Sequence, residues 1–237
     1  MTYMKKYQIV SDKITNYIKE KGLVQGDKIP KIDTLIEMYG VSKATIIQAL
    51  SLLAQKGIVY KVQGSGIFVR RPSISGYISL TSNRGFGEVL DNENTKVLKF
   101  EEIELPEKER KLMRCDEKSL CYHVVRLHFY QDKPVVLESS YFLKEYIPFL
   151  SKDIAKGSIF KFIEEGLNTE IRFSDKYIEV KKLTAEQADL LQLEEGDPAL
   201  EVNDVYYLAK GQIFNCSKLI YNYQNSKFFD QSPDELI

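Results

Sequence analysis

The 237-residue chain contains no tryptophan and only three cysteines, Cys115, Cys121 and Cys216. The cysteines form no C-x-x-C pair, and any disulfide would leave one thiol over. The sequence therefore indicates neither a disulfide framework nor a thiolate metal site. We expect three ordinary half-buried thiols in a protein of the reducing cytoplasm.

Histidine is almost as scarce. The two histidines, His123 and His128, lie five residues apart in an apparent strand, and this odd spacing places them on opposite faces. We therefore expect no metal ion. The chain also lacks a Ser-His-Asp order, an H-E-x-x-H motif, a P-loop and a Gly-rich dinucleotide fingerprint. We predict no catalytic residues and no cofactor.

Long apolar runs are missing as well. No stretch approaches the roughly 18 residues of a membrane-spanning helix, and the N-terminal sequence lacks the apolar centre of a signal peptide. With 43% hydrophobic and 28% charged residues, the composition is that of a globular protein. The length suits one large domain or two ordinary ones.

The net charge of −1 hides a division of the chain. Up to Gly76 there are 12 Lys and Arg against 5 Asp and Glu, which gives +7; the remainder has 21 against 29, which gives −8. A small basic part joined to a larger acidic part is typical of a nucleic-acid-binding module fused to a second domain. Chance segregation of charge would look the same.

Helical signals fill the first 55 residues. Apolar residues recur at helical spacing from Ile9 to Ile18, with Gly22 at the stop, and again within 31–39, which Gly40 ends. Ser42 is a good N-cap for a third helix after a turn of two residues.

The third helix predicts a helix-turn-helix. Ile46, Ala49, Leu50 and Leu53 share one face, and short polar residues occupy the opposite side of the first two turns. An ordinary helical hairpin with a solvated face would fit this segment too.

A short hairpin then favours DNA binding. The runs "GIVYKVQ" and "GIFVRR" surround a "GSG" turn, and β-branched and aromatic residues on both sides of such a turn predict two strands. A hairpin directly after a recognition helix is a wing. Lys61, Arg70 and Arg71 add positive charge for phosphate contacts.

Three stretches of this part carry a resemblance to a known family. They are "YQIVSDKITNYIKEKGLVQGDKIP", "YGVSKATIIQALSLLAQKGIVY" and "QGSGIFV". Together they resemble the winged-helix domain of the GntR family of bacterial transcription regulators. The resemblance covers nearly all of residues 7–69, in order and at the family's spacing. It implies double-stranded operator DNA as a partner. The residues expected to bind DNA are Lys31, Ser42, Lys43, Thr45, Ile47, Gln48, Lys61, Gln63, Gly64, Ser65 and Gly66.

Two positions depart from the family pattern. Asp33 and Ile47 stand where the family usually has arginines that read guanines and hold phosphates. Asp33 would repel a phosphate, and Ile47 can pack on a thymine methyl group but cannot donate a hydrogen bond. The resemblance therefore implies the family's fold for this chain, but it does not safely imply the family's usual operator sequence.

The remaining sequence predicts a mixed α+β domain. After "RPSISG", a linker by composition, strand-like runs cover 76–80, 121–130, 134–143, 199–208 and 212–223, and helical runs cover 106–113, 158–166 and 184–193. One antiparallel sheet with flanking helices is the simplest arrangement. We predict a winged helix-turn-helix in 1–70, a linker in 71–76 and an effector-binding and dimerisation domain in 77–237.

This second part resembles the UTRA domain of the HutC subfamily of GntR regulators, whose fold is similar to that of chorismate lyase. "RLHFYQDKPVVLESSYF", "SIFKFI", "LQLEEGDPAL" and "GQIFNCSKLIYNY" carry the resemblance over residues 77–225. The residues that it implies for a small anionic effector are Ser82, Asn83, Arg84, Arg126, His128, Glu138, Ser158, Phe160, Asn215 and Tyr221. His128, Phe160 and Asn215 depart from the family's residues there, so the effector need not be the commonest one.

Several alternatives remain at this point. Arg126 and His128 share one face of a strand, and Arg126 could bind an anion or pair with Glu138 across the hairpin. We favour a homodimeric repressor that responds to a sugar phosphate. A DNA-binding protein whose second domain only dimerises is an alternative, and a chorismate-lyase-like enzyme is a less favoured one, because a binding pocket needs the same Arg126 and Glu138.

Overall fold

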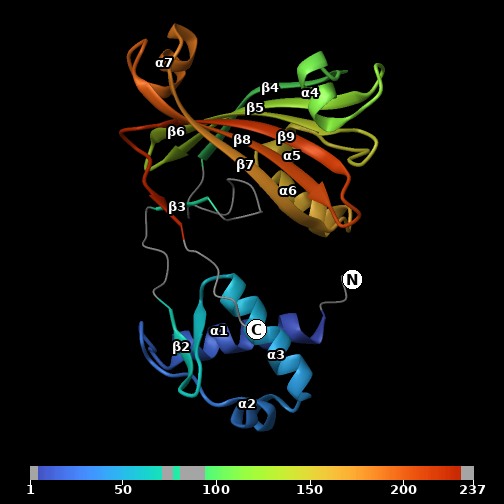
Figure 1. The fold of residues 1–237 in the computed structure, drawn as a ribbon. Helices are drawn as coiled ribbons and strands as arrows, with labels where there is room; N and C mark the ends of the chain where they lie inside the picture. Colours follow the sequence, from blue (N-terminus) through green and yellow to red (C-terminus); the bar gives the residue numbers. More distant parts are fainter. Residues whose placement is uncertain (1–4, 71–76, 81–93, 231–237) are drawn as a thin grey trace. The chain divides into compact units, whose positions relative to one another are not determined.

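The computed structural model describes residues 5–70, 77–80 and 94–230. These residues form two compact units, one helical and N-terminal and the other built on a sheet (Figure 1). The predicted linker, 71–76, lies outside the described residues. No helix within the described ranges is long and apolar enough to cross a membrane.

Three helices form the N-terminal unit: α1 (Lys6–Glu20), α2 (Ile32–Tyr39) and α3 (Lys43–Gln55). Gly40 ends α2 in the left-handed conformation, at φ 62°, which glycine adopts without steric cost. Ser42 begins α3 as expected, since its hydroxyl accepts a hydrogen bond from the Thr45 amide. Leu53 and Ile46 are fully buried in the core beneath these helices.

A small sheet completes this unit. β1 (Val59–Val62) and β2 (Gly66–Val69) pair antiparallel, as the predicted wing requires. The segment before α2 adds a third extended stretch, because Ile29 donates to the Ile67 carbonyl and Val69 donates to the Asp27 carbonyl. The prediction of a winged helix-turn-helix is confirmed.

The second unit contains a six-stranded antiparallel sheet in the order β4-β5-β6-β9-β8-β7. Its strands are β4 (Asn94–Glu104), β5 (Leu120–Tyr130), β6 (Lys133–Leu143), β7 (Ile171–Lys182), β8 (Pro198–Leu208) and β9 (Ile213–Asn222). Two further short strands, β3 (Ile78–Ser79) and β10 (Phe228–Phe229), pair with each other. The predicted α+β class is confirmed.

Helices cover both faces of this sheet (Figure 1). On one face, α4 (Glu107–Met113) and α7 (Ala185–Leu191) pack over separate apolar clusters. On the other face, α5 (Lys152–Ala155), α6 (Ile159–Lys161) and the π-helical turn η2 (Phe162–Gly166) cover one apolar cluster. The β3/β10 pair covers a second cluster on that same face. Polar side chains of the central strands lie between these two clusters.

Two strands of the sheet, β4 and β7, are absent from the sequence-based expectation. Among the strands that the structure describes, both lie at an edge of the sheet, and each pairs with one neighbour. Their residues are mostly half-buried or exposed and include many Lys and Glu. An edge strand with charged side chains lacks the apolar run that identifies a buried strand, because one side of it faces water.

Candidate functional site

The first candidate site is the exposed start of α3. Lys43, Ile47 and Gln48 are exposed there, and the Ile47 side chain remains 46% accessible. Thr45 is half-buried, with its hydroxyl 2.9 Å from the Ser42 hydroxyl. These predicted residues therefore share the outward side of one helix. The Ile46, Ala49 and Leu50 side chains hold the opposite side in the core.

A hollow of about 640 Å³ lies along the same side of α3. Sequence reasoning anticipated two of its residues, Ile47 and Gln48, but not the contribution of the segment at the start of α1. The lining comprises Lys5, Tyr7, Ile47, Gln48, Ser51, Leu52 and Gln55. A mixed polar and apolar surface of this kind can contact both base edges and thymine methyl groups.

The wing presents exposed polar groups at its tip. Lys61, Gln63, Gly64 and Ser65 are exposed, and the Ser65 amide closes the turn on the Val62 carbonyl at 3.0 Å. Lys31, another predicted DNA contact, is exposed at the N-cap of α2.

The glycine at the base of the wing has a structural role. Gly66 has φ +132°, and a Cβ there would collide with the aliphatic stem of Lys28. The Lys28 side chain is flexible and could move aside, but the positive φ is a conformation that residues with a side chain rarely adopt, and it accounts for a glycine here whether or not the wing also contacts DNA.

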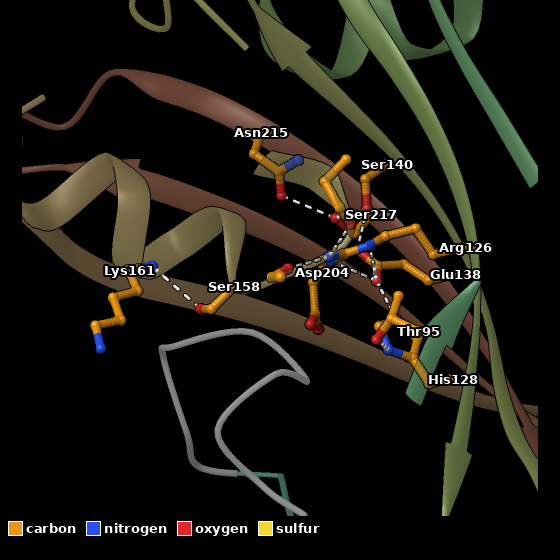
Figure 2. Close-up of polar contacts among 12 residues, drawn as sticks. Thr95, Arg126, His128, Glu138, Ser140, Ser158, Lys161, Asp204, Asn215 and Ser217 are labelled. Atoms are coloured by element: carbon orange, nitrogen blue, oxygen red, sulfur yellow. Dashed lines mark hydrogen bonds and ion pairs between the residues drawn. The ribbon is translucent and has the colours of Figure 1, made fainter. Parts of the chain in front are cut away.

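The second candidate site is centred on a buried ion pair between β5 and β6 (Figure 2). Arg126 and Glu138 lie opposite each other in the strand register, and each is 4% exposed. Arg126 Nε donates to Glu138 Oε2 at 3.0 Å, and Nη2 donates to Oε1 at 3.0 Å. Nη1 donates to the carbonyls of Ala155 and Gly157, at 3.3 and 3.0 Å. The cross-hairpin ion pair is thus present, and most of the Arg126 donors already have protein acceptors.

His128 lies beside the same carboxylate. Its Nε2 is 2.6 Å from Glu138 Oε2 and its Nδ1 is 3.2 Å from Thr95 Oγ1. Burial lowers the pKa of His128, and the neighbouring Arg126 acts in the same direction, against the opposing hydrogen bond to Glu138. The ring is therefore neutral at pH 7, with its proton on the nitrogen that faces the carboxylate.

Burial alone would raise the pKa of Glu138. The charge of Arg126 and the hydrogen bond from His128 outweigh that effect and hold the Glu138 pKa well below its usual range. Glu138 is consequently ionised at every physiological pH. Its Oε1 also accepts a hydrogen bond from Ser140 at 2.5 Å.

A chain of hydroxyl and amide groups continues from Glu138 across the sheet (Figure 2). Ser140 Oγ lies 2.8 Å from Ser217 Oγ, which donates to Asn215 Oδ1 at 2.8 Å. Asn215 Nδ2 donates to the Tyr141 carbonyl at 3.0 Å. Asn215, a predicted effector contact, is thereby connected to Glu138 through two serines.

Other predicted effector residues lie apart from this chain. Ser158 is half-buried as the N-cap of α6, where it accepts from the Lys161 amide. Phe160 is buried with its ring 4.6 Å from that of Tyr206. Tyr221 is buried in the cluster beneath β3 and β10, and burial raises its pKa. Ser82, Asn83 and Arg84 lie outside the described residues.

The sequence-based prediction did not include several polar residues of this face. They are Thr95, Ser140, Lys176, Asp204, Tyr206 and Ser217. Ser140 could have been found from its i+2 spacing to Glu138, since alternate residues of a strand share a face. Asp204 and Lys176 carried no such signal, because their place beside Ser217 depends on the β7–β8–β9 register.

This geometry predicts that stability falls in mild acid. Unfolding exposes His128 with an ordinary pKa, so below about pH 6.5 the unfolded chain binds a proton that the folded state excludes. The free energy of unfolding should then decrease by at most about 1.4 kcal/mol per pH unit for this one group. A further loss begins near pH 4.5, where unfolded Glu138 is protonated. Urea titrations of the wild type and His128→Gln at pH 7.5 and 5.5 measure the first effect.

His123 is present in both the wild type and His128→Gln, so its contribution to the change of stability with pH cancels when the two proteins are compared. Its pKa is also lowered by burial, so it contributes in the same direction to each. An equal loss of stability on acidification in the wild type and in His128→Gln would show that His128 is not held neutral.

Comparisons with known proteins agree with both units. The model of "Bacterial regulatory proteins, gntR family" matches residues 6–69, and the model of the UTRA domain matches residues 91–225. The HTH-type transcriptional regulator YydK of Bacillus subtilis, described as uncharacterized, is 39% identical over 99% of this chain and 100% of its own length. The crystal structure of YydK superposes with a TM-score of 0.85 over 97% of this chain and 100% of that chain, at 38% identity.

A further relative is named for its physiological role. The mannosyl-D-glycerate transport/metabolism system repressor MngR of Escherichia coli is 30% identical over 94% of this chain and 93% of its own length. These relatives are transcription regulators, which agrees with the prediction that the chain is not an enzyme. With a winged helix-turn-helix followed by a UTRA domain, this chain belongs to the GntR family of bacterial transcription regulators.

Proposed function

We propose that this protein is a homodimeric repressor whose binding to operator DNA is modulated by a small anionic metabolite, with a sugar phosphate as the leading candidate. In this proposal the operator is bound by residues 1–70, and the effector is bound by residues 77–237, which also form the dimer. Residues 71–76 link the two domains. The observation that carries the proposal is the buried polar chain around Glu138 and Arg126, in a protein that also exposes polar side chains at the start of α3. A domain serving only as a dimerisation scaffold has no need of such a chain.

The exposed start of α3 supports operator binding. Lys43 can contact a phosphate, and Gln48 offers an amide of the kind that binds adenine in the major groove. Ile47 adds an apolar side chain in place of a donor. The exposed wing tip and Lys61 can follow the phosphate backbone beside it.

The names of relatives support a sugar-derived effector. MngR is named for mannosyl-D-glycerate, and another relative, 24% identical over 85% of this chain, is described as a probable fructoselysine utilization operon repressor. An anion arriving at Arg126 would have to replace Glu138 or the carbonyls of Ala155 and Gly157 as an acceptor. Such an exchange would couple binding to the position of the α5–α6 segment, which is a route to a population shift.

We expect Lys43→Ala and Gln48→Ala each to weaken operator binding, by roughly 1–3 kcal/mol for a lost recognition-helix contact. Lys56→Ala, at the other end of α3, is the matched control and should bind as the wild type does. The measurement is a mobility-shift titration at fixed salt, on an operator selected from random duplex DNA. Unchanged binding by both test variants would refute the assignment of the recognition helix.

The effector class can be tested by calorimetry with hexose 6-phosphates and their unphosphorylated parents. We expect the wild type to prefer the phosphorylated forms, and Arg126→Ala combined with Glu138→Gln to bind them at least about tenfold more weakly. The second substitution avoids leaving a buried carboxylate without its cation. Arg172→Ala, which removes an exposed arginine of β7, is the control. Equal binding of both sugar forms would rule out an anion site.

The position of β7 at an edge of the sheet, among the strands described, supports a homodimer. Tyr177, Ile178 and Val180 are 58%, 48% and 73% exposed on this twelve-residue edge strand. A long edge strand with exposed apolar side chains is a template for pairing with another strand. In a two-fold antiparallel pairing of two β7 strands centred on Ile178, Asp175 of each copy would lie opposite Lys181 of the other copy. The dimer would therefore contain two such pairs of opposite charge.

Ile178→Asp should therefore convert the dimer into a monomer, because it sets two carboxylates face to face at the centre of the pairing. We expect the dissociation constant to rise at least about tenfold in sedimentation equilibrium. Val24→Asp, at an apolar residue that is 64% exposed in the other unit, is the control. A dimer that persists in Ile178→Asp would exclude this edge as the interface.

A further inference from the structure

Asp204 holds a buried carboxylate oxygen that has no hydrogen-bond partner. Among the described residues, two buried side-chain polar atoms lack a partner, namely Asp204 Oδ1 and the hydroxyl oxygen of Ser11. A carboxylate oxygen withdrawn from water without a donor is the more costly of the two, since it carries charge. Asp204 is only 3% exposed, so bulk water does not compensate it.

The other oxygen of the same carboxylate is fully engaged. Asp204 Oδ2 accepts from Lys176 Nζ at 2.8 Å and from the Tyr206 hydroxyl at 2.9 Å. Burial raises the pKa of Asp204, although Lys176 acts in the opposite direction. The carboxylate is therefore positioned by two donors while one acceptor position stays open.

Strand register places this open acceptor on the effector face. Lys176, Asp204, Ser217 and Ser140 are successive partners across β7, β8, β9 and β6. Side chains of directly paired residues point to the same face of a sheet, so Asp204 lies on the same face as Ser140. Glu138 precedes Ser140 by two residues in β6 and therefore lies on that face as well. Figure 2 shows Asp204 beside the Glu138 cluster.

Glu138 and Asp204 differ in what they can still accept. Arg126, His128 and Ser140 already donate to the two oxygens of Glu138. A ligand donor could bind Glu138 only by sharing an oxygen with these groups or displacing one of them. Asp204 Oδ1 has no donor among the described residues, so a hydroxyl group that reached it would not have to replace an existing hydrogen bond.

We propose that Asp204 Oδ1 accepts a hydrogen bond from a hydroxyl group of the effector, with Lys176 and Tyr206 as the residues that position it. A neutral hydroxyl fits better than an ammonium group, because Lys176 already balances the charge of Asp204. A second buried cation would remain uncompensated. This inference rests on the proposed effector site and adds to it a residue that selects hydroxylated ligands.

The test is calorimetry of the wild type, Asp204→Asn and Asp204→Glu with glucose 6-phosphate, mannose 6-phosphate, fructose 6-phosphate and the monodeoxy analogues of any that binds. Both variants should bind the hexose phosphates about 10- to 100-fold more weakly, the range for a hydrogen bond to a charged group. One deoxy analogue should bind the wild type with a similar loss. For the Asp204→Asn variant, the affinity for that same analogue should be no lower than the affinity for the parent sugar phosphate.

Each outcome has a distinct meaning. Wild-type affinity in both variants, or no deoxy analogue that weakens wild-type binding, overturns the role of Asp204 while leaving the proposed function intact. Failure of the wild type to bind any hexose phosphate overturns the sugar-phosphate effector and with it the role of Asp204, while operator binding is decided separately by the mobility-shift titration. Tighter binding of glucosamine 6-phosphate than of glucose 6-phosphate, lost in Asp204→Asn, would replace the hydroxyl with an ammonium group. If Asp204→Asn fails to fold, Asp204→Glu and the deoxy analogues on the wild type still decide the question.

Discussion

The ion pair of Arg126 and Glu138 is the constraint on which the second unit depends. Both side chains are almost completely withdrawn from water, and either one buried alone would cost several kcal/mol. The two charges are tolerated because they lie opposite each other in the β5–β6 register and because the remaining oxygens and nitrogens have further partners. His128, Ser140 and the carbonyls before α6 are those partners. The polar chain across the sheet continues from this pair through Ser140 and Ser217 to Asn215.

The same ion pair connects the sheet to its helical cover. Arg126 donates to the carbonyls of Ala155 and Gly157, which end α5 and precede α6. Any ligand that draws on the Arg126 donors therefore acts directly on the position of a neighbouring segment. A population shift in such a domain requires this kind of contact, because a ligand can shift the equilibrium between two conformations of a protein only by interacting differently with each of them.

Local chemistry made much of the structure predictable. Gly40 and Ser42 act on the backbone within a few residues of themselves, and α2 ends and α3 begins where these residues indicate. The wing followed from a turn between two β-branched runs. The edge strands β4 and β7 were not anticipated, since their charged residues pair with one neighbour and face water. Gly66 has a positive φ of +132°, which by itself favours glycine, and its predicted contact with DNA stays a prediction.

The sequence by itself determined that Arg126 and His128 share one face of a strand, that Arg126 could pair with Glu138 across a short hairpin, and that Ser42 is the N-cap of a helix. These conclusions depend on neighbours in sequence, where spacing alone sets direction. Only the tertiary structure decided that Asp204 and Lys176 join the same face and that most Arg126 donors already have acceptors. Those relations arise from pairing between strands far apart in the chain, whose register depends on the packing of the whole sheet.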